Sequence, residues 1–90
     1  MGKLILTRKP GESVKIGDSL VLTIREVHAK KVYAAFTEKG VTDAIWMGIL
    51  TDVKPFDGCQ ISIADISGRQ VRLHFEADNS IKIVRTELLP

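Results

Sequence analysis

The sequence of 90 residues predicts a single all-β domain, in which antiparallel sheets form a small sandwich or barrel. Apolar and polar residues alternate in short stretches along the chain, which is the pattern of half-buried strands. Turn-forming pairs such as Pro10-Gly11, Gly17-Asp18 and Ser67-Gly68 separate these stretches. No longer segment has a helical period, so strands are expected to build the core.

The strands are expected where the alternation is clearest. A leading strand covers residues 3–9. Residues 42–50 are also expected to be a strand, because Gly40, Gly48 and the short length disfavour a helix there. The apolar residues that mark the other strands are Val14 and Ile16; Leu20, Leu22 and Ile24; Val32, Ala34 and Phe36; Ile61 and Ile63; Val71, Leu73 and Phe75; and Ile81 and Ile83.

The composition excludes several classes of protein. The single cysteine, Cys59, cannot form an internal disulfide and is expected to be a buried apolar residue. The chain has no apolar run long enough for a signal peptide or a membrane span, so we expect a cytoplasmic protein that does not enter a membrane. Neither histidine, His28 or His74, belongs to a catalytic, metal-binding or cofactor motif, so an enzyme is not expected.

The charge is nearly balanced, with 13 Lys and Arg against 11 Asp and Glu, and a net charge of +2. Such a charge does not identify a nucleic-acid-binding protein by itself. Residues 1–11 nevertheless contain Lys3, Arg8 and Lys9 and no acid. A site for a polyanion is therefore expected to be local and to include the leading strand.

An internal repeat appears when residues 12–50 are aligned without gaps with residues 51–89. In both segments the alternation slips at the same point, as a β-bulge requires: between Ile24 and Val27, and between Ile63 and Ile66. Two unrelated meanders of similar strand length are the alternative, but they do not explain this shared slip. The predicted organisation is a leading strand over residues 3–9, then four-strand repeats over residues 12–50 and 51–90 that share one core. The identical pairs are Val14/Val53, Lys15/Lys54, Asp18/Asp57, Ile24/Ile63, Val32/Val71, Phe36/Phe75 and Leu50/Leu89.

The opening segment Leu4-Ile5-Leu6-Thr7-Arg8-Lys9, followed by Gly11-Glu12 and Ile16-Gly17-Asp18, resembles the first two strands of the carbon storage regulator (CsrA/RsmA) family of bacterial mRNA-binding proteins. The hairpin over residues 67–72 and the last strand over residues 81–88 resemble the rest of that family's chain. The resemblance implies a dimer-like fold in which the first strand lies beside the last strand of the opposite half. It also implies a cytoplasmic translational regulator that binds GGA-containing mRNA near the ribosome-binding site, or a small regulatory RNA. The residues implied in RNA binding are Leu6, Thr7, Arg8, Lys9, Ala77, Ile83, Val84 and Arg85.

The two repeats differ at the residue that this resemblance makes important. Arg85 of the second repeat aligns with Trp46 of the first, and the second repeat has no Leu-Ile-Leu-Thr-Arg strand before it. We therefore expect a monomeric pseudo-dimer with one RNA site. Asp78 and Asn79 stand where the family usually has proline and often a basic residue, so phosphate attraction is expected to be weaker there.

A protein-interaction module is the alternative function. Such a degenerate relative would modulate ordinary family dimers, or would bind a protein partner through Ile45, Trp46 and Met47. The other interpretation of Trp46 is that it fills the core, or covers the sheet edge where a second leading strand is missing.

Overall fold

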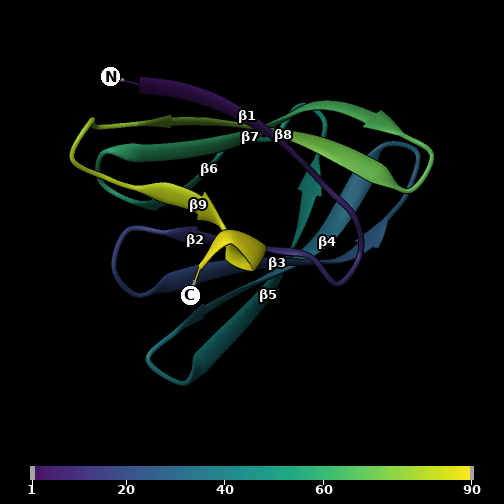
Figure 1. The fold of residues 1–90 in the computed structure, drawn as a ribbon. Coiled ribbons are helices and arrows are strands. Elements are labelled where there is room, and N and C mark those ends of the chain that lie inside the picture. The colour runs from purple at the N-terminus through teal and green to yellow at the C-terminus, as the bar shows by residue number, and fades with distance from the viewer. Residues whose placement is uncertain (1, 90) are drawn as a thin grey trace.

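Nine strands and one short 3-10 helix make up residues 2–89, the part of the chain that the computed structural model describes (Figure 1). The all-β prediction is confirmed, and the expected strand over residues 42–50 is present as Val41–Gly48, with residues 49 and 50 in the turn that follows. No helix in this part of the chain is long and apolar enough to cross a membrane. The elements are β1 (Gly2–Arg8), β2 (Ser13–Ile16), β3 (Leu20–Val27), β4 (Lys31–Glu38), β5 (Val41–Gly48), β6 (Val53–Phe56), β7 (Cys59–Ser67), β8 (Gln70–Ala77), β9 (Ile83–Arg85) and η1 (Thr86–Leu88).

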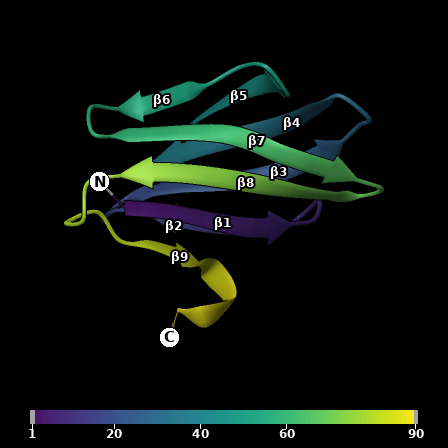
Figure 2. The ribbon, with the colours of Figure 1, turned by 90° about the horizontal axis from the view of Figure 1, so that it is seen from above.

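The strands form two antiparallel sheets that lie face to face. One sheet has the order β1-β8-β7-β6 and the other has the order β5-β4-β3-β2-β9. No strand pairing joins the two sheets, so residues 2–89 form an open sandwich and not a barrel. Figure 2 shows that β1 and β9 lie along one side of the sandwich and that β5 and β6 lie along the other. Each side is thus bordered by edge strands from different sheets.

The core lies between the inner faces of the two sheets. Residues at every second position of a strand point to the same face, so the alternation that predicts the strands also selects the buried side chains. Leu22, Ile61 and Phe75 are among the fully buried residues, and Cys59 is buried as expected. Burial raises the pKa of the Cys59 thiol, which makes this cysteine an unreactive core residue.

The two central hairpins have the same register. β3 with β4, and β7 with β8, superimpose at the shift of the sequence repeat. Each ladder slips once, at equivalent positions, which confirms the two predicted β-bulges. The equivalent pairs are Leu22 with Phe36 and Ile61 with Phe75, and the slips lie between Ile24 and Glu26 and between Ile63 and Asp65.

The repeat prediction is wrong about the place of β5. The alignment makes residues 44–46 equivalent to residues 83–85, which form β9. Instead, β9 pairs with β2, whereas β5 folds back on its neighbour β4. Lys39 and Gly40, which connect β4 to β5, both have positive φ. Such a turn matches the twist of a tight hairpin, so the local connection decides the position of β5.

The structural counterpart of β5 is the leading strand β1. β5 pairs with β4 in the same register in which β1 pairs with β8. The duplicated unit therefore consists of β1 to β4 and of β5 to β8, and β9 has no counterpart among residues 2–89. This replaces the predicted division into a leading strand and two four-strand repeats. The equivalent pairs are Gly2–Ala77 and Val41–Glu38, Leu4–Phe75 and Asp43–Phe36, Leu6–Leu73 and Ile45–Ala34, and Arg8–Val71 and Met47–Val32.

The last strand is shorter than its resemblance to the family implied. Strand pairing covers Ile83 to Arg85 only, and the next three residues form η1. Hydrogen bonds from this turn, described below, hold the end of the chain against β1 and β2.

Candidate nucleic-acid interface

The free edges of β1 and β9 border one side of the sandwich (Figure 2). Within residues 2–89, β1 pairs only with β8 and β9 pairs only with β2. The resemblance implied that the first and last strands lie side by side. They belong to different sheets instead, and each leaves backbone donors and acceptors along its outer edge without a strand partner.

A pocket of about 170 Å³ lies between these two strands. Its inner wall is apolar, and its mouth carries Lys3 and Asp78. Gly2 lies against Asn79, because a Cβ atom at Gly2 would be 3.1 Å from the Asn79 Oδ1 atom. The residues that line the pocket are Gly2, Lys3, Leu4, Phe75, Ala77, Asp78, Asn79, Ile81 and Ile83.

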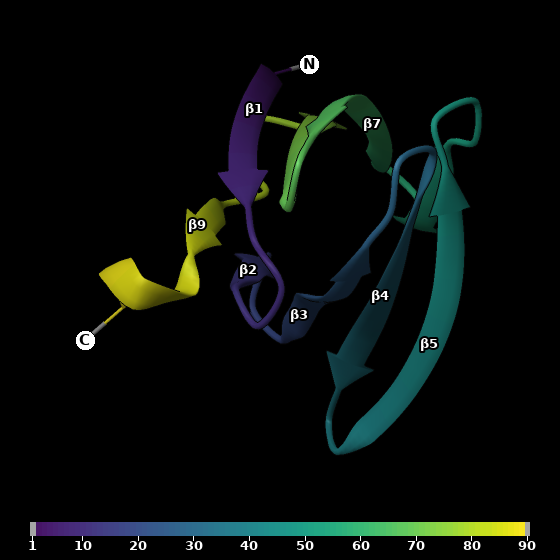
Figure 3. The ribbon, with the colours of Figure 1, turned by 90° about the vertical axis from the view of Figure 1, so that its right-hand side faces the viewer.

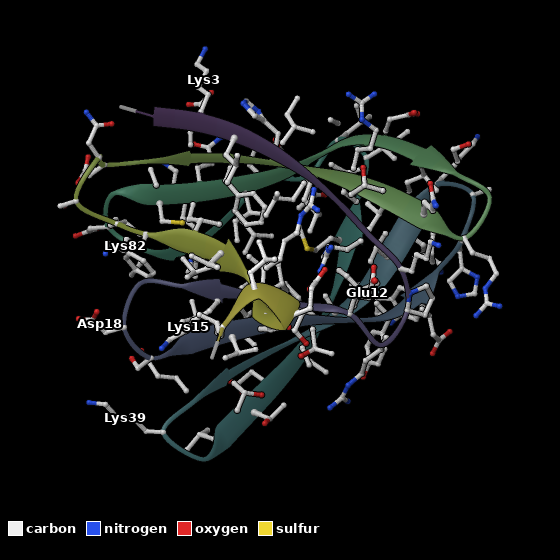
Figure 4. The ribbon with its side chains drawn as sticks, viewed as in Figure 1. Lys3, Glu12, Lys15, Asp18, Lys39 and Lys82 are labelled. Atoms are coloured by element: carbon white, nitrogen blue, oxygen red, sulfur yellow. The ribbon has the colours of Figure 1, made fainter. Side chains whose placement is uncertain are left out.

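Basic side chains surround this side of the molecule. Figure 4 labels Lys3 on β1, Lys15 on β2 and Lys82 just before β9. Arg85 is exposed, and its position on β9 is opposite the buried residue Val14, so it shares the inward face of that sheet with Ile83. Cations thus lie on or beside both edge strands, and Lys15 lies on β2, between β3 and β9.

Arg8 fastens the end of β1 to the end of the chain. Its Nη1 and Nη2 atoms donate to the two carboxylate oxygens of Glu87 at 2.8 and 2.9 Å. Its Nε atom donates to the carbonyl oxygen of Thr7 at 2.7 Å, and Nη1 also donates to that of Ser13 at 3.3 Å. The Thr86 hydroxyl donates to the same Ser13 oxygen at 3.3 Å. We call this group of contacts the Arg8–Glu87 clamp.

The clamp stays charged at neutral pH. Its hydrogen bond to Glu87 raises the pKa of Arg8 above the ordinary value, and burial opposes this only in part. The hydrogen bond from Arg8, aided by the positive charge of Arg85, lowers the pKa of Glu87 from 4.5 to about 2. Only 3% of the surface of Arg8 is exposed, so its guanidinium has little capacity left for a ligand.

The residues that the sequence implied in RNA binding differ in their exposure. Leu6, Arg8 and Ala77 are buried, so their side chains support the site from within. Thr7 is half-buried on the outer face, opposite Arg72. The accessible ones are Lys9 in the turn after β1, the half-buried Ile83 and Val84, and the exposed Arg85.

Sequence reasoning did not name several residues of the pocket. Leu4 and Ile81 become neighbours only because the first and last strands, which pair in different sheets, border the same side. The absence of acids from residues 1–11 is the one sequence signal that pointed to Lys3.

Comparisons of the chain with protein-family models, with curated proteins and with solved structures give no match. The interpretation of this interface therefore depends on its own chemistry and on the resemblance of the motifs.

Trp46 lies on the outer face of β5, and 49% of its surface is exposed. Its ring centroid lies 4.7 Å from that of Tyr33 and 5.6 Å from that of His28, and the Lys31 Nζ atom is 4.5 Å from the ring centroid. Met47 is fully buried, and Ile45 packs against the core. The segment of residues 45–47 thus presents only its middle side chain outward. β5 covers the edge of β4, while the indole of Trp46 stays outside the core.

The described residues, 2–89, contain no group of three or more His, Cys, Asp or Glu side chains that could hold a metal ion.

Proposed function

We propose that the chain is a sequence-specific RNA-binding regulator that binds a GGA-containing loop or single strand of mRNA between β1 and β9. Such binding near a ribosome-binding site would control translation or mRNA stability. The observation that carries the proposal is the juxtaposition of two unpaired strand edges, a small pocket between them, and basic residues on or beside both edge strands. The resemblance of the first and last strands to the carbon storage regulator family supports it.

The chemistry of this side suits unpaired RNA. Proteins read loop bases through the exposed base edges, and free backbone N–H and C=O groups can supply the matching hydrogen bonds. Arg85 offers a planar fork for a phosphate or a guanine edge, and Lys3 and Lys82 offer point charges for phosphates. Asp78 at the mouth of the pocket opposes phosphate binding and is expected to limit affinity.

Arg8 acts in this proposal as a positioning residue. The Arg8–Glu87 clamp ties η1, and with it the end of β9, to the end of β1. Arg85 directly precedes η1, so the clamp also restrains the backbone of Arg85 at the end of β9.

One chain is proposed to hold one RNA site as a monomeric pseudo-dimer. On the opposite side of the sandwich, Asp43 occupies the place of Leu4, and Glu38 occupies the place of Ala77. Met47 takes the place of Arg8, so that side also has no clamp. Carboxylates at these positions would repel RNA phosphates.

The second candidate function is a protein-interaction module, and the exposed indole of Trp46 favours it. Aromatic anchors of this kind are common in protein interfaces. RNA binding remains the first proposal. The pocket and the basic residues that support it lie on the opposite side of the molecule from Trp46.

RNA binding can be tested by fluorescence anisotropy with a GGA hairpin and with the same hairpin mutated in its loop. Arg85→Ala is expected to weaken binding by about 1–3 kcal/mol, because a charge-assisted contact to phosphate or guanine is lost. Lys30→Ala and Lys31→Ala, near the β3–β4 turn, are matched controls that should change affinity little. Equal weakening by all three substitutions, or equal affinity for both hairpins, would contradict the proposal.

A further inference from the structure

A second groove lies on the opposite side of the sandwich, between the free edges of β5 and β6. Its volume is about 530 Å³, against about 170 Å³ for the pocket between β1 and β9. Phe36, Ile45 and Val53 line it, and Val41 on its margin is 64% exposed. Figure 3 shows β5 at the far side of the molecule from β1 and β9. We call it the β5–β6 groove.

The internal repeat shows which element is missing from this groove. In the other half, β9 pairs with β2, and the counterpart of β2 is β6. Val53 pairs with Ile61 as Val14 pairs with Leu22, and the sequence repeat aligns Lys54 with Lys15. After Val53 the β6–β7 ladder slips by one residue, whereas the β2–β3 ladder is regular. Lys15 is the residue opposite Val84 of β9. Within residues 2–89 no strand takes that place beside Lys54.

We propose that the β5–β6 groove binds an extended segment of a partner protein, which adds to β6 as an antiparallel strand. The geometry of this addition is already present in the molecule, where β9 adds to β2. On β9 the side chains that face inward are Ile83, which is apolar, and Arg85, which is basic. The occupant is therefore a segment with apolar residues at alternate positions and at least one Lys or Arg.

Charge favours a basic peptide over RNA in this groove. Glu38 and Asp43 line the groove beside a single lysine, Lys39. Asp52 and Asp57 stand just before and just after β6. Such carboxylates attract a cationic side chain and repel the phosphates of a nucleic acid.

A second copy of this chain does not offer the required strand. Its β9 is held on β2, where the Gly17 N–H donates to the Lys82 carbonyl at 2.7 Å. The Arg8–Glu87 clamp holds the residues that follow. Release of this strand would break both sets of contacts, so a different protein is the better source.

The test uses the full chain and, as the probe, a fluorescein-labelled peptide with the sequence of residues 80–88. Fluorescence anisotropy is expected to show saturable binding in the absence of RNA. In ¹H–¹⁵N spectra the shifts should move at Lys54 and along β5. The matched control peptide has proline in place of Val84. Because the Lys82 carbonyl faces β2, Val84 two residues later presents its N–H to the same edge, and proline removes that donor.

Charge reversal provides the second variant. Asp43→Lys should weaken binding of the probe about five- to tenfold. A probe with glutamate in place of both Lys82 and Arg85 should bind this variant better than it binds the unmodified chain. Shifts confined to β2 would mean that the peptide displaces β9, and would overturn the proposal. Equal binding of the proline peptide, no binding of the probe, or dimerisation through the groove would also overturn it.

Discussion

Phe36 and Phe75 are the same residue at equivalent positions of the two hairpins, but only one of them is covered. Phe75 has none of its surface exposed, and it lies beside the Leu4 side of β1 and the segment that leads into β9. Phe36 is only partly buried and lines the open β5–β6 groove beside Asp43. Substitution of each phenylalanine by alanine compares the stability contributed by burial on the β1–β9 side with that on the β5–β6 side.

The magnitudes follow from these two environments. Truncation of a fully buried phenylalanine costs about 3–5 kcal/mol, through lost burial and the cavity left behind, so this is the expectation for Phe75→Ala. Phe36→Ala should cost about 1–2 kcal/mol, because part of the ring is already in water and the groove has no tight packing to lose. A domain of this length has a total stability of roughly 5–13 kcal/mol. Phe75→Leu and Phe36→Leu therefore provide a gentler pair in case the alanine variant of Phe75 does not fold.

The assay is unfolding in urea followed by the fluorescence of the single tryptophan, Trp46. The free energy of unfolding should fall more for the Phe75 variant than for the Phe36 variant in both pairs, with unchanged dependence on urea. Equal losses, or a larger loss at Phe36, would refute the view that one side of the sandwich is closed and the other open.

Three further predictions concern the Arg8–Glu87 clamp and the assembly. The pKa of Glu87 is lower in the folded chain, so its pairing with Arg8 stabilises the fold fully above pH 4.5, and this stabilisation is lost as the pH falls toward about 2. Glu87→Gln should remove this part of the acid unfolding transition. An acid unfolding profile identical to that of the unmodified chain would contradict this prediction. Light scattering should give a mass near 10.0 kDa, whereas a stable mass of about twice that value would count against a single-chain pseudo-dimer. Titration of a one-motif GGA hairpin should saturate at one RNA per chain, and a second motif on the same RNA should raise affinity only about twofold, without the avidity of a two-site protein; a plateau at two RNAs would show that the Asp43 side also binds.

The strands could be predicted because their signal is local. Alternation places Leu22 and Ile24 on one face of their strand, and Ile61 and Ile63 on one face of theirs. The structure buries all four. The β-bulges were also predictable, since an extra residue shifts the alternation of the sequence itself. The buried place of Cys59 needed no more than its residue type and its strand.

The candidate site was only partly accessible to the same reasoning. Arg85 is exposed at the end of β9, but Arg8 is buried and bound to Glu87. The sequence shows an arginine on an amphipathic strand in both cases. Arg8 is not free because it binds the carboxylate of Glu87, which is 79 residues away in the chain, and a local sequence pattern cannot predict a contact over that separation.

By itself, the sequence determined an all-β chain, the positions of its strands and turns, and the presence of a repeat. Only the tertiary structure decided that β5 is the counterpart of β1, because residues 2–11 and 41–50 share almost no side-chain identity. Strand pairing depends on backbone hydrogen bonds and on register, which many sequences satisfy equally well. The tight Lys39-Gly40 turn returned β5 to its neighbour β4, whereas β9 crossed from the sheet of β8 to the free edge of β2. That choice closed one side of the sandwich and left the other open.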